Sequence, residues 1–215
     1  MQDASLQATY LFDPLCGWCY GASPALERLA RLDGVSVALA PTGLFAGEGA
    51  RPMDAQFAAY AWQNDQRIAR LTGQPFTQTY RTGILDRADG LFDSAPATLG
   101  IVAVGLSESA REFEALKALQ RGRYVEGRDT ADLAVVADIL EQAGSAAAAA
   151  RVRQPDEDLL AAYRNRTAAA RTKMSRFGVN GVPALIVEGA KGERLLPSQA
   201  LFGDFDQLAA QVRAA

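Results

Sequence analysis

The alternation of apolar and polar residues predicts strands near both ends of the chain and helices between them. Residues 7–13 form a short apolar run with aromatic and β-branched members, which is typical of a buried strand. A helical pattern with Leu26 and Leu29 on one side follows it, and residues 35–40 alternate as a second strand. A strand, a helix and a strand at this spacing predict a βαβ unit with parallel pairing.

Residues from about 52 to 175 carry only helical patterns. The first pattern has apolar positions from Phe57 to Leu71, and Gly73 is placed to end it. Pro155 and the three acids after it predict the start of a long helix, because acidic side chains interact favourably with a helix N-terminus. The sequence therefore predicts a large all-helical insertion after the βαβ unit.

Strand patterns return after the insertion. Residues 183–188 are apolar and β-rich, residues 189–192 form a predicted turn, and residues 193–196 predict the partner strand of a hairpin. Residues 204–207 match a capping box, so a last helix is expected. The predicted order is βαβ–ββα in an α/β protein. The predicted parts are an α/β domain made of 1–50 and 176–215, and an inserted helical domain at 51–175 whose last helix continues into the α/β domain.

The composition is that of a globular protein with a sizeable core. The 215 residues are 49% hydrophobic and 22% charged, and the formal net charge is −3. Because no basic run stands out, neither nucleic acid nor a membrane is predicted as a partner. Residues 1–5 lack the basic and apolar regions of a signal peptide, and no stretch reaches transmembrane length. The sequence as written therefore predicts a cytoplasmic protein.

The only two cysteines lie between the first strand and the first helix, in the segment Cys16-Gly17-Trp18-Cys19. A Cys-x-x-Cys in this place is typical of a redox pair. Cys16 is expected at or next to the helix N-terminus, where unpaired N–H groups and the helix dipole favour a thiolate. The thiolate is the nucleophilic form of cysteine. The redox-active disulfide Cys16–Cys19 would itself be the reactive group, and no other cofactor and no metal are predicted.

Two other interpretations of the pair are open. A structural disulfide across two residues closes a very short loop and removes little chain entropy, so stability alone would rarely favour it. A zinc site usually needs four cysteine or histidine ligands. This chain has no histidine and no third cysteine, so only a dimer would complete such a site.

Two motifs carry a resemblance to a known family. The skeleton with Cys-x-x-Cys after its first strand resembles the thioredoxin superfamily, and the helical insertion resembles its DsbA family. The segment FDPLCGWCYG, residues 12–21, is similar to the opening of FrnE-like DsbA proteins. The segment FGVNGVP, residues 177–183, is similar to the family's cis-proline loop. The resemblance implies a thioredoxin-like fold and thiol-disulfide oxidoreductase activity.

The resemblance also implies roles for individual residues. Cys16 would be the attacking thiolate, Cys19 the resolving thiol, and Pro183 a cis-proline that faces the pair. Val182 would offer its backbone N–H and C=O to an extended substrate, as in strand addition. Trp18 is expected to be exposed beside Cys16 and to contact substrate.

The sequence departs from the family at the proton acceptor. Gly17 and Tyr20 support the motif, but Tyr10 stands six residues before the first cysteine, where related proteins place a buried acid. Asp13 is the nearest acid in the sequence. It is either a proton relay for Cys19 through water or a structural cap of the turn before Pro14.

The predicted function is a protein-disulfide oxidoreductase or isomerase that exchanges disulfides with protein or peptide cysteines. A cellular dithiol reductant or glutathione would be its partner, and a cytoplasmic location favours reduction or isomerisation. An alternative is a glutathione-dependent isomerase or transferase of the same fold. Such enzymes typically carry serine in place of Cys16 and lack the second cysteine. A metal-binding or chaperone-like module without enzymatic activity is the third possibility.

Overall fold

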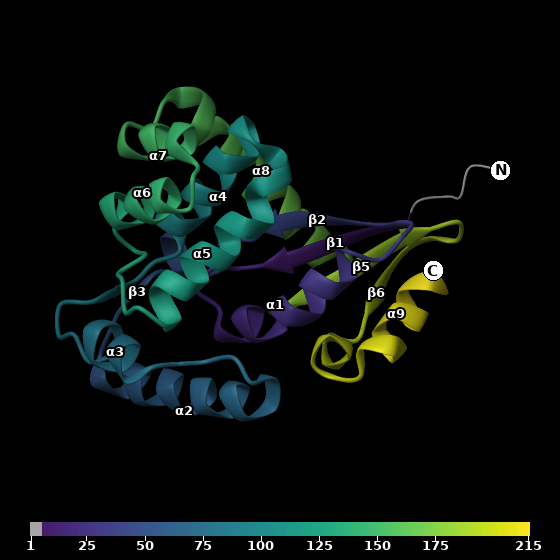
Figure 1. Ribbon diagram of the computed structural model, residues 1–215, viewed down its shortest axis with the longest axis horizontal. Helices are drawn as coiled ribbons and strands as arrows, with labels where there is room; N and C mark the ends of the chain where they lie inside the picture. Colours follow the sequence, from purple (N-terminus) through teal and green to yellow (C-terminus); the bar gives the residue numbers. More distant parts are fainter. Residues whose placement is uncertain (1–5) are drawn as a thin grey trace.

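The computed structural model describes residues 6–215, so residues 1–5, on which the signal-peptide interpretation depends, lie outside the described part. A four-stranded mixed sheet has the order β2-β1-β5-β6 (Figure 1). β1 pairs in parallel with β2 and antiparallel with β5, and β5 forms a hairpin with β6. The predicted βαβ–ββα order is confirmed. The strands are β1 (Leu6–Phe12), β2 (Val35–Pro41), β5 (Ala184–Gly189) and β6 (Gly192–Leu196).

The alternation of side chains along β1 divides the core between the two faces of the sheet. Tyr10 and Phe12 face the side that is covered by α1 (Gly17–Leu29) and α9 (Phe205–Arg213). Leu11 faces the other side, where it packs with Met174 of α8 (Glu157–Arg176). Helices on both faces therefore hold the strand end from which the cysteine motif begins.

Helix α1 begins at Gly17, directly after Cys16, and contains Pro24 in its interior. A proline inside a helix leaves the carbonyl four residues earlier without its usual N–H partner. Here that carbonyl belongs to Tyr20, and it accepts hydrogen bonds from the Ser23 hydroxyl at 2.7 Å and the Gln74 amide at 3.2 Å. The helix can therefore carry its apolar face, including the fully buried Leu26, past the proline.

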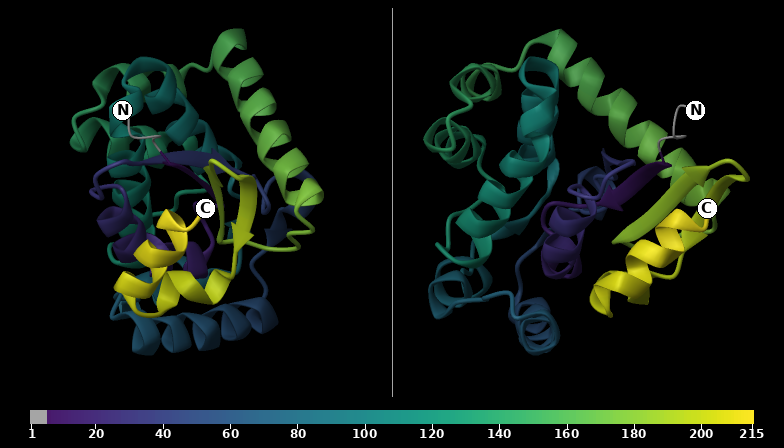
Figure 2. Two further views of the ribbon diagram at one scale, coloured as in Figure 1. Left: turned by 90° about the vertical axis from the view of Figure 1, so that its right-hand side faces the viewer. Right: turned by 45° about the vertical axis from the view of Figure 1, so that its right-hand side comes forward.

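The insertion is helical apart from one short ladder, in which β4 (Leu91–Phe92) pairs with β3 (Arg51–Pro52). The expectation of an all-helical segment missed this ladder because a strand of two residues carries no readable period. Figure 2 shows α2 lying along the end of the molecule beside α1. The helices are α2 (Ala55–Thr72), α3 (Gln78–Tyr80), α4 (Ala95–Ser107), α5 (Glu112–Tyr124), α6 (Leu133–Gln142), α7 (Ala146–Arg153) and α8.

Helix ends follow the capping residues of the sequence. Asp54, Asp156 and Asp204 each accept a hydrogen bond from the backbone N–H three residues later, at the starts of α2, α8 and α9. Gly73 ends α2 with a φ of 76°, a left-handed conformation that glycine adopts at low cost. Pro155 lies two positions before Glu157, the first residue of α8, whereas the sequence suggested that Pro155 itself would be that first residue.

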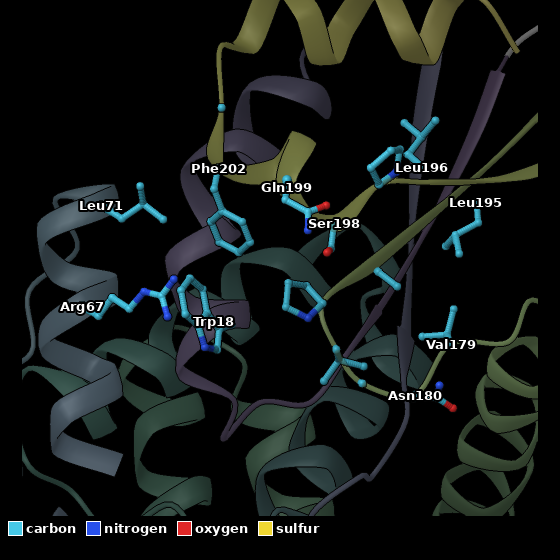
Figure 3. Close-up of a pocket in the computed structure, with 16 residues that line it drawn as sticks. Trp18, Arg67, Leu71, Val179, Asn180, Leu195, Leu196, Ser198, Gln199 and Phe202 are labelled. Carbon is cyan, nitrogen blue, oxygen red and sulfur yellow. The ribbon is translucent and has the colours of Figure 1, made fainter. Parts of the chain in front are cut away.

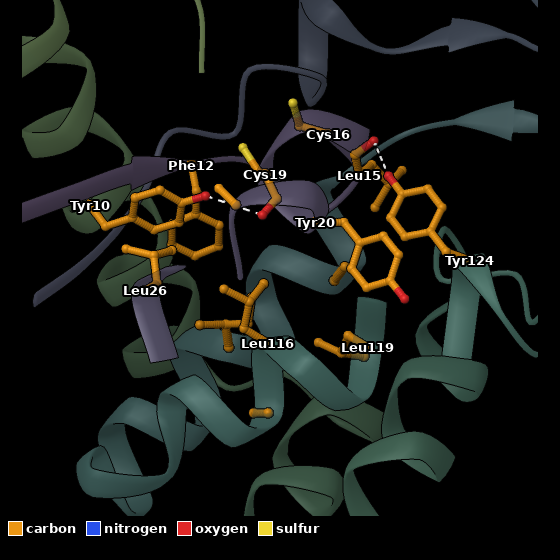
Figure 4. Packing of buried hydrophobic residues seen from close by; sticks show 14 of the residues in the cluster. Tyr10, Phe12, Leu15, Cys16, Cys19, Tyr20, Leu26, Leu116, Leu119 and Tyr124 are labelled. Carbon is orange, nitrogen blue, oxygen red and sulfur yellow. Dashed lines mark hydrogen bonds between the residues drawn. The ribbon is translucent and has the colours of Figure 1, made fainter. Parts of the chain in front are cut away.

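One cluster of buried residues runs through both predicted domains. It joins Tyr10 and Leu26 of the α/β part to Leu116 and Leu119 of α5 (Figure 4). The domain boundaries at 50 and 176 stay a prediction. No helix within residues 6–215 is long and apolar enough to cross a membrane.

Candidate active site

Both cysteines lie at the N-terminus of α1. Cys16 is the N-cap residue, and its carbonyl accepts the helix hydrogen bond from the Tyr20 N–H at 3.0 Å. Cys19 lies in the first turn, and Figure 4 shows the two sulfur atoms on the same side of the helix. Both are free thiols in this structure. Cys16 is 8% exposed and Cys19 is 1% exposed, so Cys16 is the more accessible of the two.

The loop before β5 contacts the motif across 166 positions of the sequence. The Cys16 thiol donates a hydrogen bond to the Val182 carbonyl, with a sulfur–oxygen distance of 3.4 Å. The Val182–Pro183 peptide bond is cis, as expected from the sequence. The structure therefore brings Cys16 together with the loop that contains Val182 and Pro183, the two residues that the sequence singled out.

Cys19 lies in a buried and largely apolar environment. Burial raises the pKa of the Cys19 thiol well above its usual value, and the neighbouring Cys16 raises it further. A hydrogen bond with the backbone of Asp13 acts in the opposite direction. The Cys19 thiol is therefore kept protonated until a partner removes its proton.

Tyr10 occupies the strand position where related proteins place an acid, but it does not act as a base here. Its hydroxyl donates a hydrogen bond to the Cys19 carbonyl at 3.3 Å, and its ring stacks on Phe12 at 5.6 Å. Burial raises the pKa of Tyr10 well above its usual value, so the phenol stays protonated. Tyr10 thus supports the first turn of α1.

Asp13 is completely buried and holds the loops that surround the motif. Its carboxylate accepts hydrogen bonds from the Leu15 N–H at 2.9 Å, the Phe45 N–H at 3.1 Å and the Ser94 hydroxyl at 2.7 Å. Burial raises the pKa of Asp13, and these hydrogen bonds lower it in part. The cap interpretation thus has three contacts in its favour, while the proton relay stays a prediction.

Gly17 and Tyr20 fit the motif against the insertion. A Cβ atom on Gly17 would lie 2.5 Å from Oδ1 of Asp65, so α2 approaches the motif too closely for any side chain at this position. Tyr20 stacks on Tyr124 at a centroid distance of 4.9 Å. The Tyr124 hydroxyl donates to the Leu15 carbonyl at 2.7 Å, which ties α5 to the residue before Cys16.

A pocket of about 740 Å³ opens beside the motif and contains all three residues that were expected to bind substrate. Trp18, Val182 and Pro183 all line it, and Figure 3 shows Trp18 between Arg67 and Phe202. The Phe202 ring meets the Trp18 indole edge-on at 5.2 Å, and the Arg67 guanidinium lies over it at 5.7 Å.

Sequence reasoning missed the parts of the pocket that come from distant segments. The residues missed are Arg67 and Leu71 of α2 and Ser198, Gln199 and Phe202 near the start of α9. An arginine on the polar side of a helix gives no signal of a site. Phe202 gave a weak one, since it is a large apolar residue in a segment without a predicted element.

A second group that the sequence did not reveal lies on the buried side of the motif. Asp65 is 5% exposed and Arg123 is 1% exposed, and the Tyr80 hydroxyl donates to Asp65 at 3.0 Å. One signal was present in the sequence. Asp65 lies at helical spacing from Ala58 and Ile68, which places a charged residue on the apolar face of α2.

Among residues 6–215, no three histidine, cysteine, aspartate or glutamate side chains are grouped so that they would hold a metal ion.

Two thiols at a helix N-terminus, facing a cis-proline loop, form the site of a thioredoxin-fold protein-disulfide oxidoreductase. The chain belongs to the DsbA-like thioredoxin domain family, whose sequence profile matches residues 9–212. The FrnE-like branch within this family stays a prediction.

Solved structures of similar sequence agree with this assignment. The cytosolic disulfide reductase DsbM from Pseudomonas aeruginosa is 33% identical, with a TM-score of 0.81, and the match covers 97% of this chain and all (100%) of DsbM. A structure of DsbM with GSH is 32% identical over 96% of this chain and 99% of that one, with a TM-score of 0.79.

A putative protein disulfide isomerase from Nitrosomonas europaea is 28% identical over 96% of this chain and 98% of its own, with a TM-score of 0.75. No curated protein sequence shows a significant match to the chain. The matching family profile and the similar structures confirm the fold, the family and the class of enzyme that the resemblance of the two motifs implied.

Proposed function

We propose that this chain reduces disulfides of protein or peptide substrates in the cytosol through Cys16 and Cys19, and that glutathione or a cellular dithiol restores the pair. The observation that carries the proposal is the placement of the Cys16 thiol. It caps α1, bonds to the Val182 carbonyl and lies beside a pocket lined by Trp18 and Pro183. The similarity to a cytosolic disulfide reductase supports the reducing direction.

The exchange proceeds in two balanced steps. The Cys16 thiolate attacks one sulfur of the substrate disulfide and forms a mixed disulfide, while the other substrate sulfur leaves as a thiolate and takes up a proton. Cys19 then loses its proton and attacks the Cys16 sulfur. The Cys16–Cys19 disulfide forms and the second substrate thiol is released. Two thiols of glutathione, or one dithiol, reduce the enzyme again.

The backbone at Val182 is suited to hold an extended substrate. Its carbonyl already accepts the Cys16 thiol at 3.4 Å, so a peptide that pairs with this edge places its own sulfur near Cys16. Pro183 contributes no N–H that would compete for the sulfur atoms. The redox group in this scheme is the cysteine pair itself.

Insulin reduction with glutathione as the reductant tests the proposal. The protein is expected to reduce insulin disulfides and to show no conjugation of glutathione to a small electrophile such as chlorodinitrobenzene. Conjugation without insulin reduction would support the glutathione-dependent alternative. Stoichiometric zinc in the reduced protein, without turnover of either substrate, would support the metal-binding one.

Arg67 is expected to contribute to glutathione binding in the pocket beside Trp18. Glutathione carries two carboxylates, and Arg67 is the only charged side chain among the pocket's lining residues. Replacing Arg67 with glutamine should raise the Kd for glutathione about threefold, since an exposed ion pair contributes modestly. Isothermal titration calorimetry measures this directly.

The matched control is Arg70→Gln, which removes an equal charge from an exposed position of the same helix outside the pocket. It should leave the Kd for glutathione unchanged. Equal effects of the two substitutions would show that Arg67 acts only through the overall charge of α2 and does not contact the ligand.

A further inference from the structure

Three polar side chains of the insertion meet in the apolar interior behind the cysteine motif. They are Asp65 of α2, Tyr80 of α3 and Arg123 of α5. The Tyr80 hydroxyl donates to Oδ2 of Asp65 at 3.0 Å. The Arg123 guanidinium lies 5.8 Å from the centre of the Tyr80 ring and 5.5 Å from that of Phe92.

The guanidinium of Arg123 is buried without a hydrogen-bond partner among the described residues. A buried charge of this kind needs an opposite charge nearby. Asp65 provides it, because the positive charge of Arg123 lowers the pKa of the Asp65 carboxyl. The two side chains therefore form a charge pair whose state depends on the proton of Asp65.

Asp65 lies directly against Gly17, the first residue of α1. Oδ1 of Asp65 occupies the space where a Cβ atom of Gly17 would be, only 2.5 Å from that position, and Gly17 is bonded to Cys16. Tyr124 provides a second connection between Asp65 and Cys16. Burial raises the pKa of the Tyr124 phenol well above its usual value, and charges on both Asp65 and Cys16 raise it further. Asp65 and Cys16 are therefore both within electrostatic reach of one buried group.

We propose that Asp65 is a positioning residue that sets the charge behind the N-terminus of α1, so that loss of its proton makes Cys16 less reactive. The inference rests on the proposed function of Cys16 as the attacking thiol. While Asp65 is protonated, the positive charge of Arg123 is uncompensated and favours a thiolate at the end of the helix. Once Asp65 is ionised, the pair is neutral and this support is lost.

The pKa of the Asp65 carboxyl lies near neutral pH, where the reactivity of Cys16 is proposed to change. Burial raises the pKa of Asp65 to about 7, although the Tyr80 hydrogen bond and the Arg123 charge lower it in part. The other titratable groups that interact with it are Tyr80, Arg123 and Tyr124. Burial raises the pKa of both phenols well above the usual value, so they stay protonated near neutral pH.

The insertion therefore supplies a buried acid directly beside the cysteine motif. This also explains the glycine in the motif. A side chain at position 17 would require Oδ1 of Asp65 to move away from α1. The absence of a side chain at Gly17 thus leaves the space that Asp65 of α2 occupies.

The rate of Cys16 alkylation by iodoacetamide between pH 5 and pH 9, in a Cys19→Ser background, tests the inference without any substrate. With Asp65 present, the alkylation rate should rise with pH less steeply around pH 7 than it would if the Cys16 thiol were the only group that loses a proton. Asp65→Asn should restore a single titration and raise the rate above pH 8 about threefold, since a buried negative charge is removed. Tyr80→Phe should move the break to higher pH, because the Tyr80 hydrogen bond lowers the pKa of Asp65.

Asp54→Asn is the matched control, since it removes a charge from the exposed N-cap of the same helix and asparagine also caps well. Its profile should equal that of the parent. Equal profiles for Asp65→Asn and the parent would overturn the inference. Continued insulin reduction in that case would show that the proposed function stands without it.

A second measurement does not depend on how the variants fold. The carbon-13 NMR signal of the Asp65 carboxyl in the unsubstituted protein should titrate with a midpoint near 7. This pKa of Asp65 in the folded protein lies above that of an unfolded aspartate, so the protonated side chain favours the folded state. Its contribution to the free energy of unfolding is complete below about pH 4 and is lost as the pH rises through about 7. A carboxyl midpoint near 4 would overturn the inference.

Discussion

Replacing Cys16 with serine is expected to abolish insulin reduction, with a loss of roughly a thousandfold or more, because a serine hydroxyl is not ionised at neutral pH and forms no disulfide. The structure gives the reason for choosing this thiol. Cys16 is the more exposed of the pair and contacts the Val182 carbonyl. The turnover of insulin disulfides, followed by oxidation of the reductant, measures the effect.

Cys19→Ser should stop turnover at a different point. Attack by Cys16 is still possible, but the resolving thiol is absent, so mixed disulfides between Cys16 and the substrate should accumulate. Non-reducing gel electrophoresis and peptide mapping detect them. Trapping by Cys16→Ser instead, or equal trapping by both variants, would contradict the order of attack and resolution.

Replacing Asp13 with alanine should lower the free energy of unfolding by about 3–5 kcal/mol. The substitution leaves the Leu15 N–H, the Phe45 N–H and the Ser94 hydroxyl without their acceptor in a completely buried place. Each unpaired buried group costs on the order of 1–3 kcal/mol, with partial relaxation expected. Urea denaturation followed by circular dichroism gives the difference.

Two further variants separate the hydrogen bonds of Asp13 from its charge. Asp13→Asn retains an acceptor oxygen, so it should cost less, about 1–2 kcal/mol. Asp89→Ala removes an exposed carboxylate that, within residues 6–215, pairs with Arg87 alone, and it should change stability by less than about 0.5 kcal/mol. A loss of less than about 1 kcal/mol for Asp13→Ala would show that the loops do not depend on this carboxylate.

The parts of the fold that follow from local patterns were predictable. The buried strand before the motif, the hairpin after residue 183 and the cap at Asp204 each depend on residues within one element. The cysteine pair and Pro183 were predictable as well, because their types and spacing resemble a known family. These features carry their information in a short stretch of sequence.

The parts of the site that come from α2 could not be predicted. Nothing near Gly17 in the sequence indicates that Asp65, 48 positions later, fills the space of its missing side chain. Arg67 likewise reaches Trp18 only because α2 lies beside α1. The direction in which an inserted helix returns to the motif depends on packing over long sequence distances. The single usable sign was a charged residue on the apolar face of that helix.

Equilibration of the protein with mixtures of reduced and oxidised glutathione tests directly whether Cys16 and Cys19 form a reducing redox pair. We expect a reversible Cys16–Cys19 disulfide with a midpoint near the thioredoxin value, at about −270 mV. Peptide mapping after alkylation would quantify it. A midpoint near the DsbA value of about −120 mV, or no disulfide between the two cysteines at any glutathione ratio, would show that Cys16 and Cys19 are not a reducing pair.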